Sequence, residues 1–288
     1  MAYGKFSPAI VNNYNLVDYT VGGTKYANIS IFKTTPATMS VAPAYYLKGN
    51  KKLMENLHPE GVLADKLVAK CTASPMTYGQ TGDTSYGLYY TVGGTLFYSG
   101  KQLPTPGSYT PDTQGHDWPA FCVKKDGSAI IRWFDNSSAL TTALPYCSAI
   151  IAAGNPLVYG GQSVFESIIK STADAMLKIY DPNEKDSSKQ HFNNNICTPI
   201  LSPAYRVFFG HKSDGSYFLV CLDRCTMDMR VGAKLMCDLG CDYAVNEDGG
   251  QAVQMRVATG YTGSKYQPGQ MTSGGTDYYG ACICAYLK

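Results

Sequence analysis

The sequence predicts an α+β fold, in which mixed or antiparallel sheets are accompanied by a few helices. Short runs with β-like alternation recur along the chain and are separated by glycine-containing turns, whereas a few longer segments carry apolar residues at helical spacing. No repeat with a period of about 20 to 50 residues emerges, which argues against a solenoid. At 288 residues the chain can bury a large core without disulfides, and we expect one domain over residues 1–288.

The first half combines predicted strands with two predicted helices. VDYTVGG and YANISIF read as strands, and GLYYTVGGTLFYSG reads as a hairpin around its Val-Gly-Gly turn. YYLKGNKKLMENL at 45–57 has helical periodicity, and HPEGVLADKLVAKCTAS at 58–74 is expected to be a second helix or a helix running into a strand. The Pro- and Gly-rich segment Lys101–His116 is expected to be a surface loop.

The second half carries clearer turn signals. AFCVKKDGSAIIRWF and YRVFFGHKSDGSYFLVCLD each read as a hairpin whose turn contains Asp-Gly, so Asp126-Gly127 and Asp214-Gly215 are interpreted as turns. GGQSVFESIIKSTADAMLKIY predicts a helix, followed by the polar loop Asp181–Asn195. VGAKLMCDLGC predicts a helix that ends at Gly240, and DYAVNEDGGQAVQMRVA predicts two strands joined by a glycine turn.

Charge and hydropathy exclude several classes of protein. The formal net charge is +2 with 16% charged residues, and the basic residues are scattered, so we expect no duplex nucleic acid as partner. No window approaches the roughly 18 apolar residues of a membrane span, and the start MAYGKFSPAIVNNYN has no signal-peptide pattern. We therefore expect a soluble protein that is not bound to a membrane.

The ten cysteines are expected to be reduced thiols rather than a disulfide framework. Four of them form a C-x3-C-x11-C-x3-C array, Cys221, Cys225, Cys237 and Cys241, whose spacing raises the alternative of a zinc site. Because Cys221 lies in an apolar strand and the last two straddle a helix end, buried thiols are favoured over a metal. We expect no metal and no cofactor.

One group of residues in the C-terminal part points to a ligand site. A helix that returns the chain to the sheet would place the strand ending at Val245 beside the strand that opens at Arg206. Arginine offers a planar fork for phosphate oxygens, Asn246 donates to and accepts from a sugar hydroxyl, and Asp248 can act as base or nucleophile. The glycine pair at 249 and 250 allows a close approach of backbone N–H groups to an anion. Together these groups match a sugar phosphate ester.

Histidines are the remaining candidates for general acid–base catalysis. His211 follows Arg206 closely enough to be expected at the same sheet edge. His116 and His191 lie in the two polar loops, where a histidine is usually solvated. Walker-type phosphate loops, H-E-x-x-H and G-x-S-x-G are absent from the sequence.

The block 200–258 resembles the phosphodiester glycosidase family. That family shows an Arg that enters an apolar strand, a Gly a few residues on, an Asp-Gly turn, a Leu-rich helix ending in Leu-Gly, and a strand closing in N-L-D-G-G-G-S. The residues of this chain at the matching positions are Arg206, Gly210, Asp214, Gly215, Leu239, Gly240, Asn246, Asp248, Gly249 and Gly250. The resemblance implies a phosphodiester glycosidase-like domain and a hydrolase that cleaves a sugar-1-phosphodiester.

The sequence departs from the family pattern at several positions. Glu247 replaces the leucine between Asn and Asp, and Gln251 stands where the motif ends in Gly-Ser. The family's Asn-Gly segment falls on KCTASPMTYG, where Thr72 and Ser74 stand instead. We predict catalytic roles for Asp248, Arg206 and Glu247. Substrate-binding roles are predicted for Asn246, Gly249, Gly250, His211, Thr72 and Ser74.

Two classes of function remain open. The first is a hydrolase acting on a sugar-phosphodiester or nucleotide-like small molecule, such as a cell-wall glycan or a nucleotide sugar. The second is a non-catalytic protein of the same fold that sequesters a sugar or ribose nucleotide, or that serves as a glycan-binding or structural component of a phage particle. The resemblance includes phage proteins, which places the chain in a host cytoplasm or a virion and allows a homo-oligomer or virion assembly.

Overall fold

The computed structural model describes residues 5–7, 13–45, 52–53, 59, 62, 66–73, 89–92, 95–98, 101–102, 119–133, 142–153, 155–165, 203–249, 253–257, 278–279 and 281–288. These residues form four β-sheets, in which every strand pair is antiparallel. None of the helices in these ranges is long and apolar enough to span a bilayer.

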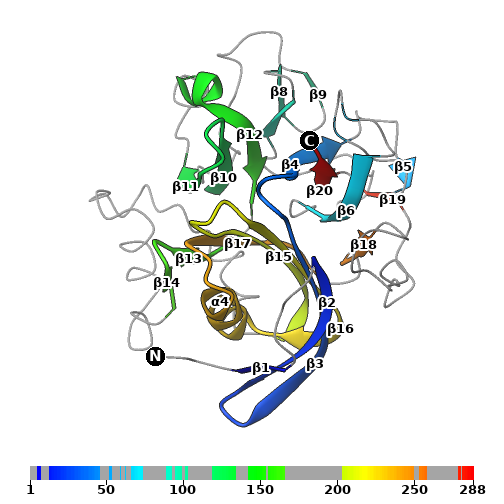
Figure 1. Cartoon of the computed structure of the whole chain (residues 1–288), viewed down its shortest axis with the longest axis vertical. Coiled ribbons are helices and arrows are strands. Elements are labelled where there is room, and N and C mark those ends of the chain that lie inside the picture. Colours follow the sequence, from blue (N-terminus) through cyan, green and yellow to red (C-terminus); the bar gives the residue numbers. More distant parts are fainter. Residues whose placement is uncertain are drawn as a thin grey trace.

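The largest sheet has eight strands. They are β1 (Lys5–Ser7), β2 (Tyr14–Val21), β3 (Thr24–Lys33), β16 (Tyr217–Met227), β15 (Ala204–His211), β17 (Tyr243–Gly249), β13 (Pro156–Tyr159) and β14 (Gln162–Ser163), in this order across the sheet. The sheet curls around the helix α4 (Met229–Asp238), which lies in its hollow (Figure 1).

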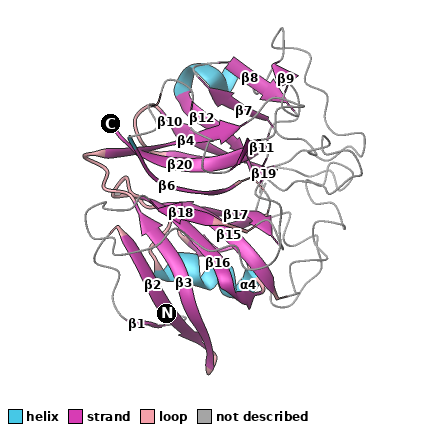
Figure 2. Ribbon diagram, turned by 90° about the vertical axis from the view of Figure 1, so that its right-hand side faces the viewer, coloured by secondary structure: helices cyan, strands magenta, loops and turns pink. Residues whose placement is uncertain are grey.

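The other sheets are smaller. The six-stranded sheet runs in the order β11 (Ala129–Trp133), β10 (Pro119–Lys124), β12 (Cys147–Ala152), β7 (Tyr89–Val92), β8 (Thr95–Tyr98) and β9 (Lys101–Gln102). The four-stranded sheet contains β18 (Met255–Val257), β6 (Leu67–Thr72), β20 (Ala281–Leu287) and β4 (Met39–Tyr45), and the two-stranded sheet pairs β19 (Tyr278–Tyr279) with β5 (Lys52–Leu53). A short 3-10 helix, η3 (Leu144–Tyr146), precedes β12. The four- and six-stranded sheets both lie on the same side of the eight-stranded sheet (Figures 1 and 2).

The predicted α+β class is wrong, because the described chain is built from sheets with a single α-helix. Lys52–Leu53, expected to be helical, is strand β5, and Leu67–Thr72 is strand β6, which agrees with the alternative of a helix running into a strand at 58–74. β6 pairs with β18 on one side and β20 on the other, and five of its six residues are buried. A strand covered on both faces gives a continuous apolar run, which cannot be told from a buried helix by periodicity.

Several local predictions are confirmed. α4 occupies most of the segment VGAKLMCDLGC and is followed by Gly240, whose φ of +84° suits glycine at a helix end. Its N-cap is Asp228, whose side chain accepts a hydrogen bond from the Val231 N–H. The hairpins β7–β8, β10–β11 and β15–β16 form as their turn residues predict. The predicted helix at 160–180 lies largely outside the described residues.

Two hydrophobic cores cover the two faces of the eight-stranded sheet. One fills the space between this sheet and the four- and six-stranded sheets, and includes Phe209, Val245 and Ile283. The other lies under α4 and includes Phe208 and Ala244. Alternation along β15 and β17 therefore decides which core each side chain faces.

The two larger sheets contain the same three-stranded unit. β10 lies between β11 and β12, as β15 lies between β16 and β17. Each central hairpin turns through the pattern K-x-D-G-S, at 124–128 and at 212–216. The units pack against each other through Phe121 and Phe209, whose ring centroids are 4.6 Å apart. The same strand order and turn pattern therefore occur twice in the chain, 88 residues apart.

Candidate functional site

Arg206 lies between two irregularities in the sheet. On one side β15 pairs with β17, where Arg206 is opposite Gly249 and Phe208 is opposite Asn246, so β17 contains an extra residue between these pairs. On the other side Arg206 is opposite Leu222 of β16, and the register shifts again before Ala204. β-bulges occur preferentially beside functional sites, where they re-aim side chains. The register also places the end of β17 beside the start of β15, as the sequence predicts.

The side chain of Arg206 is held inside the protein. It is only 2% exposed, and its Nε donates a hydrogen bond of 2.9 Å to the carbonyl of Met227. Burial lowers the pKa of the guanidinium to about 10, while the carboxylate of Asp228 opposes this shift. The group therefore remains positively charged at neutral pH and is fixed in position, which are the two properties needed to hold an anion.

Two buried asparagines lie on and beside β17, the strand that pairs with the Arg206 strand. Asn246 faces the same core as Phe208 and is 6% exposed; its Nδ2 donates to the carbonyl of Glu247, but its Oδ1 has no hydrogen-bond partner. The N–H of Asn246 donates to the carbonyl of Asn155, 2.7 Å away, and the Nδ2 of Asn155 also lacks a partner. An unmatched acceptor and an unmatched donor thus belong to two residues whose backbones are hydrogen-bonded to each other. Buried polar atoms of this kind are rare and call for a ligand or water.

The other residues of the NEDGG segment are placed as follows. Glu247 is 1% exposed and lies on the opposite face of the sheet from Asn246. It is close to Cys71 of β6: burial raises the pKa of the Cys71 thiol most, and the charge of Glu247 raises it further. Asp248 and Gly249 belong to β17 rather than to a turn, so the strand continues further than expected. A Cβ on Gly249 would lie 3.4 Å from the carbonyl oxygen of Tyr205, which shows how closely the two backbones approach. Gly250 lies outside the described residues.

Thr72 lies at the end of β6 and forms two hydrogen bonds with the backbone of Gln254. The N–H of Thr72 donates to the carbonyl of Gln254, and the N–H of Gln254 donates to Thr72 Oγ1 at 3.3 Å. The Gln254 side chain is fully buried, and neither its Oε1 nor its Nε2 has a partner. Gln254 is a candidate that the sequence analysis missed. Ser74 lies outside the described residues.

Asp223 is a second candidate missed from the sequence. It lies in the stretch of β16 where the register shifts beside Arg206, and its side chain is fully buried. Its carboxylate oxygens form no hydrogen bond, and the nearest cation is the Nε of Arg224 at 4.0 Å. Burial raises the pKa of this carboxyl, an effect that Arg224 only partly opposes. The feature of the sequence that points to Asp223 is a carboxylate directly after the apolar run FLVCL.

His211 is not brought to Arg206. It ends β15 at the opposite end of the strand, opposite Tyr243 of β17, and alternation puts it on the other face of the sheet. The loop histidines His116 and His191, and the second polar loop, lie outside the described residues.

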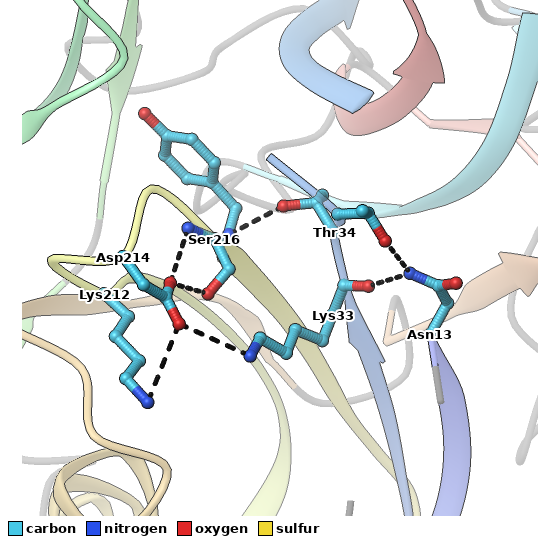
Figure 3. Close-up of polar contacts among 8 residues, drawn as sticks. Asn13, Lys33, Thr34, Lys212, Asp214 and Ser216 are labelled. Atoms are coloured by element: carbon cyan, nitrogen blue, oxygen red, sulfur yellow. Dashed lines mark hydrogen bonds and ion pairs between the residues drawn. The ribbon is translucent and has the colours of Figure 1, made fainter. Parts of the chain in front are cut away.

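The two Asp-Gly segments are turns, as predicted. Asp214 accepts hydrogen bonds from the N–H and the hydroxyl of Ser216, and its other oxygen lies 3.5 Å from Lys33 and 3.7 Å from Lys212 (Figure 3). Asp126 accepts the equivalent two bonds from Ser128. The glycines that follow have φ values of +84° and +87°, which suit glycine. Asp214 therefore stabilises a turn and is not available for chemistry at Arg206.

The four-cysteine array does not converge on one point. Cys221 packs in the core between the sheets, whereas Cys225, Cys237 and Cys241 pack against the core under α4, on the other face. Burial raises the pKa of the Cys221 and Cys241 thiols well above its ordinary value. The array thus lacks the geometry of a tetrahedral zinc site, and no metal-binding group of His, Cys, Asp and Glu occurs among the described residues.

Comparison with known proteins shows to which family the chain belongs. A sequence model of phosphodiester glycosidases matches residues 68–276, which include β6, the Arg206 strand and the NEDGG segment. The chain belongs to the phosphodiester glycosidase family. The resemblance predicted from the block 200–258 is therefore confirmed. No curated protein sequence matches the chain.

Solved structures share the phosphodiester glycosidase fold. The catalytic domain of zebrafish N-acetylglucosamine-1-phosphodiester alpha-N-acetylglucosaminidase, auto-inhibited by its pro-peptide, aligns with 100% of this chain and 87% of its own, with a TM-score of 0.59 and 16% identity. A hypothetical protein from Synechocystis aligns with 94% of this chain and 62% of its own, with a TM-score of 0.52 and 10% identity. At these identities the similarity is one of fold.

Proposed function

We propose that the protein hydrolyses a sugar-1-phosphodiester, cleaving the bond between the anomeric carbon and the phosphate oxygen. One observation carries this proposal: the buried cation of Arg206 lies opposite Gly249 of β17, the strand that also holds Asn246 with its unmatched Oδ1, and the backbone of Asn246 is hydrogen-bonded to Asn155, whose Nδ2 is unmatched. A guanidinium suits the phosphate, and an acceptor–donor pair suits a sugar hydroxyl. Family membership supports the same reaction.

Arg206 would stabilise the charge that develops on the departing phosphate. Its hydrogen bond to Met227 fixes the guanidinium before substrate arrives, so little reorganisation is needed in the transition state. The backbone N–H groups around Gly249 would add donors to the same phosphate. Because a phosphodiester leaves as an anion of low basicity, the leaving group needs little help from a general acid.

Asp248 is proposed to direct water at the anomeric carbon or to attack it, through an oxocarbenium-like transition state. Glu247 is a candidate for a supporting carboxylate, although it lies on the face opposite Asn246. Asp223 is a better candidate than Glu247 for a carboxyl group that stays protonated, because burial raises the pKa of Asp223. The substrate would be a small sugar-phosphodiester or a nucleotide-like molecule.

A binding protein without turnover is the second candidate. The observation that favours it is the sequence around the site, where Glu247 and Gln251 replace family residues and Thr72 and Ser74 stand in place of the Asn-Gly segment. Such a protein would sequester a sugar nucleotide or recognise a phosphorylated glycan, including in a phage particle.

The products formed in oxygen-18 water distinguish these functions. With the methyl phosphodiester of N-acetylglucosamine-1-phosphate as probe, cleavage at the anomeric carbon gives labelled free sugar and unlabelled methyl phosphate. Cleavage at phosphorus would give unlabelled sugar and labelled phosphate, which contradicts the proposed reaction. Saturable binding by calorimetry with no product supports the binding protein. The same assay with UDP-N-acetylglucosamine tests nucleotide-like substrates.

A further inference from the structure

A cavity of about 810 Å³ lies at the opposite end of β15 from Arg206. Both K-x-D-G-S turns line it, at 124–128 and 213–215, together with His211, Tyr217 and Asp242. The two repeated hairpins thus point their turns at one space, and the hydroxyl of Tyr217 donates a 3.0 Å hydrogen bond to the carbonyl of Gly127 across it. The volume lies within the range of small-molecule sites.

Polar groups in the cavity wall lack partners in the protein. His211 is 4% exposed, and neither its Nδ1 nor its Nε2 has a partner with full hydrogen-bond geometry. The Gly127 carbonyl, which accepts the Tyr217 hydroxyl, is close enough to raise the pKa of the ring as a hydrogen-bond acceptor, so at least one ring nitrogen is left without a partner in the protein. Asp242 Oδ2 is buried and also unmatched. Leaving such atoms unsatisfied is costly, which points to a ligand that completes them.

The charge and shape of the lining favour an uncharged ligand. The lining contains Lys124, Lys125 and Lys288 and three aspartates, 126, 214 and 242, so the formal charges of the lining residues balance when His211 is neutral. Asp214 is in addition paired with Lys33 and Lys212, which are not part of the lining. Burial lowers the pKa of His211, more than the surrounding carboxylates raise it, so the imidazole is neutral at pH 7 and offers one donor and one acceptor.

Aromatic surface accompanies these polar groups. Tyr217 and Tyr243 both line the cavity, but the ring of Tyr217 is 5% exposed and contacts the rings of Phe209 and His211. Tyr243 is half-buried and meets Tyr159 edge to face, so its ring is the one that offers a surface to the C–H groups of a pyranose, while the hydroxyl groups of the ligand can both donate to and accept from the unmatched atoms.

We propose that this cavity is a second ligand site, which binds a neutral polyhydroxylated molecule such as a saccharide unit through His211, Asp242 and the ring of Tyr243. Five residues of extended strand separate His211 from Arg206, about 17 Å at 3.3 Å per residue. The site is therefore distinct from the candidate hydrolytic site and does not depend on the proposed reaction.

The test is saturation-transfer NMR and calorimetry with methyl α-D-glucopyranoside, methyl α-D-mannopyranoside and methyl N-acetyl-β-D-glucosaminide. These probes carry no phosphate, so binding is measured whether or not the protein is a hydrolase. We expect saturable binding of at least one probe by the wild type and by Arg206→Ala. Asp242→Asn should weaken it about tenfold or more, the usual cost of a hydrogen bond to a charged group.

A cavity-filling pair of variants locates the site. Ser148 is exposed and lines the cavity, so Ser148→Phe should abolish binding, whereas Thr20→Phe, at an exposed position of β2 outside the lining, should leave it unchanged. Thermal unfolding checks that each variant is folded. If the cavity variants do not fold, the amide resonances of Gly127 and Gly215 in the wild type must shift on titration.

Three results would overturn the proposal. The first is that none of the saccharides binds saturably or shifts these resonances. The second is binding that Arg206→Ala abolishes and Ser148→Phe retains, which would place the sugar at the hydrolytic site. The third is saturable binding of methylammonium chloride or sodium sulfate in place of the saccharides, which would make the ligand a charged one.

Discussion

Arg206 of β15 lies directly opposite Gly249 of β17, and the strand register shifts on both sides of this arginine. Because Gly249 has no side chain, the backbones of β15 and β17 approach closely at this point, where a Cβ would lie 3.4 Å from the Tyr205 carbonyl oxygen. Regular pairing from Phe208 and Asn246 onward would instead place Asp248 opposite the arginine.

Replacing Arg206 should remove most of the activity. Loss of a positioned transition-state donor typically costs about 10²–10³ in kcat, so Arg206→Ala should fall in that range, and Arg206→Lys should recover only part, because a point charge lacks the planar fork. The measurement is kcat with a sugar-1-phosphodiester. Arg132→Ala, on the exposed part of β11, is the matched control and should keep normal turnover. Full activity in Arg206→Ala would exclude this residue from the site.

The turn at Asp214 should make stability depend on acid pH. Partial burial raises the pKa of this carboxyl, but hydrogen bonds from Ser216 and the charges of Lys33 and Lys212 outweigh it and hold the pKa below its ordinary value. A lowered pKa stabilises the fold above the unfolded value near 4, and this stability disappears as the pH falls through the folded value. Urea unfolding at neutral pH and at about pH 3 measures it.

Asp214→Asn should flatten this acid dependence. Asp126→Asn changes the equivalent carboxylate of the other hairpin, which is fully exposed and has no lysine pair of this kind among the described residues, so its effect should be smaller. Equal losses in the two variants would contradict the role assigned to Lys33 and Lys212.

His211 should contribute a second pH dependence. Its burial lowers the pKa, while Asp242, the Gly127 carbonyl, Asp214 and Asp126 oppose the shift. The unfolded chain therefore binds a proton before the folded protein as the pH falls below about 6.5, and stability should decrease through that window. Chemical unfolding from pH 7 to pH 5 should show this slope in the wild type and a shallower one in His211→Gln. An unchanged slope would show that the imidazole stays equally accessible to protons in both states.

Gly232 permits α4 to approach the sheet. A Cβ at this position would collide with the ring of Phe208, which is the residue opposite Asn246. Gly232→Ala should destabilise the protein by about 1–3 kcal/mol, although alanine is the better helix former. Phe208→Leu in the same chain should recover part of this loss, seen as a coupling energy in a double-mutant cycle of urea unfolding. Strictly additive losses would mean that the two residues do not touch.

Local chemistry explains which features could be predicted from the sequence. The Asp-Gly turns and the helix end at Gly240 depend on φ values that few residues tolerate, so a short segment specifies them. The nature of the segment at 58–74 stayed open between helix and strand because the residues of β6 are buried on both faces. The predicted α+β class is wrong because helical spacing at 45–57 does not give a helix at Lys52–Leu53, which pair with β19.

The candidate site was partly predictable for a similar reason. The ordered motif around Arg206 and Asn246 identified the family and the neighbouring strands. Asn155, Asp223 and Gln254 were missed, since their interest comes from burial without hydrogen bonds, which depends on distant strands. His211 was expected near Arg206 because five residues separate them, yet in an extended strand this spacing leads to the other end and the other face.

The proposed hydrolysis at the anomeric carbon is tested most directly by locating the oxygen-18 label in the products. The methyl phosphodiester of N-acetylglucosamine-1-phosphate is the substrate, and the wild type is compared with Asp248→Asn. We expect labelled free sugar with the wild type and at least about a 100-fold slower release of sugar with Asp248→Asn, since the carboxylate acts at the reacting carbon. Label in the phosphate, or full activity in the variant, would contradict it.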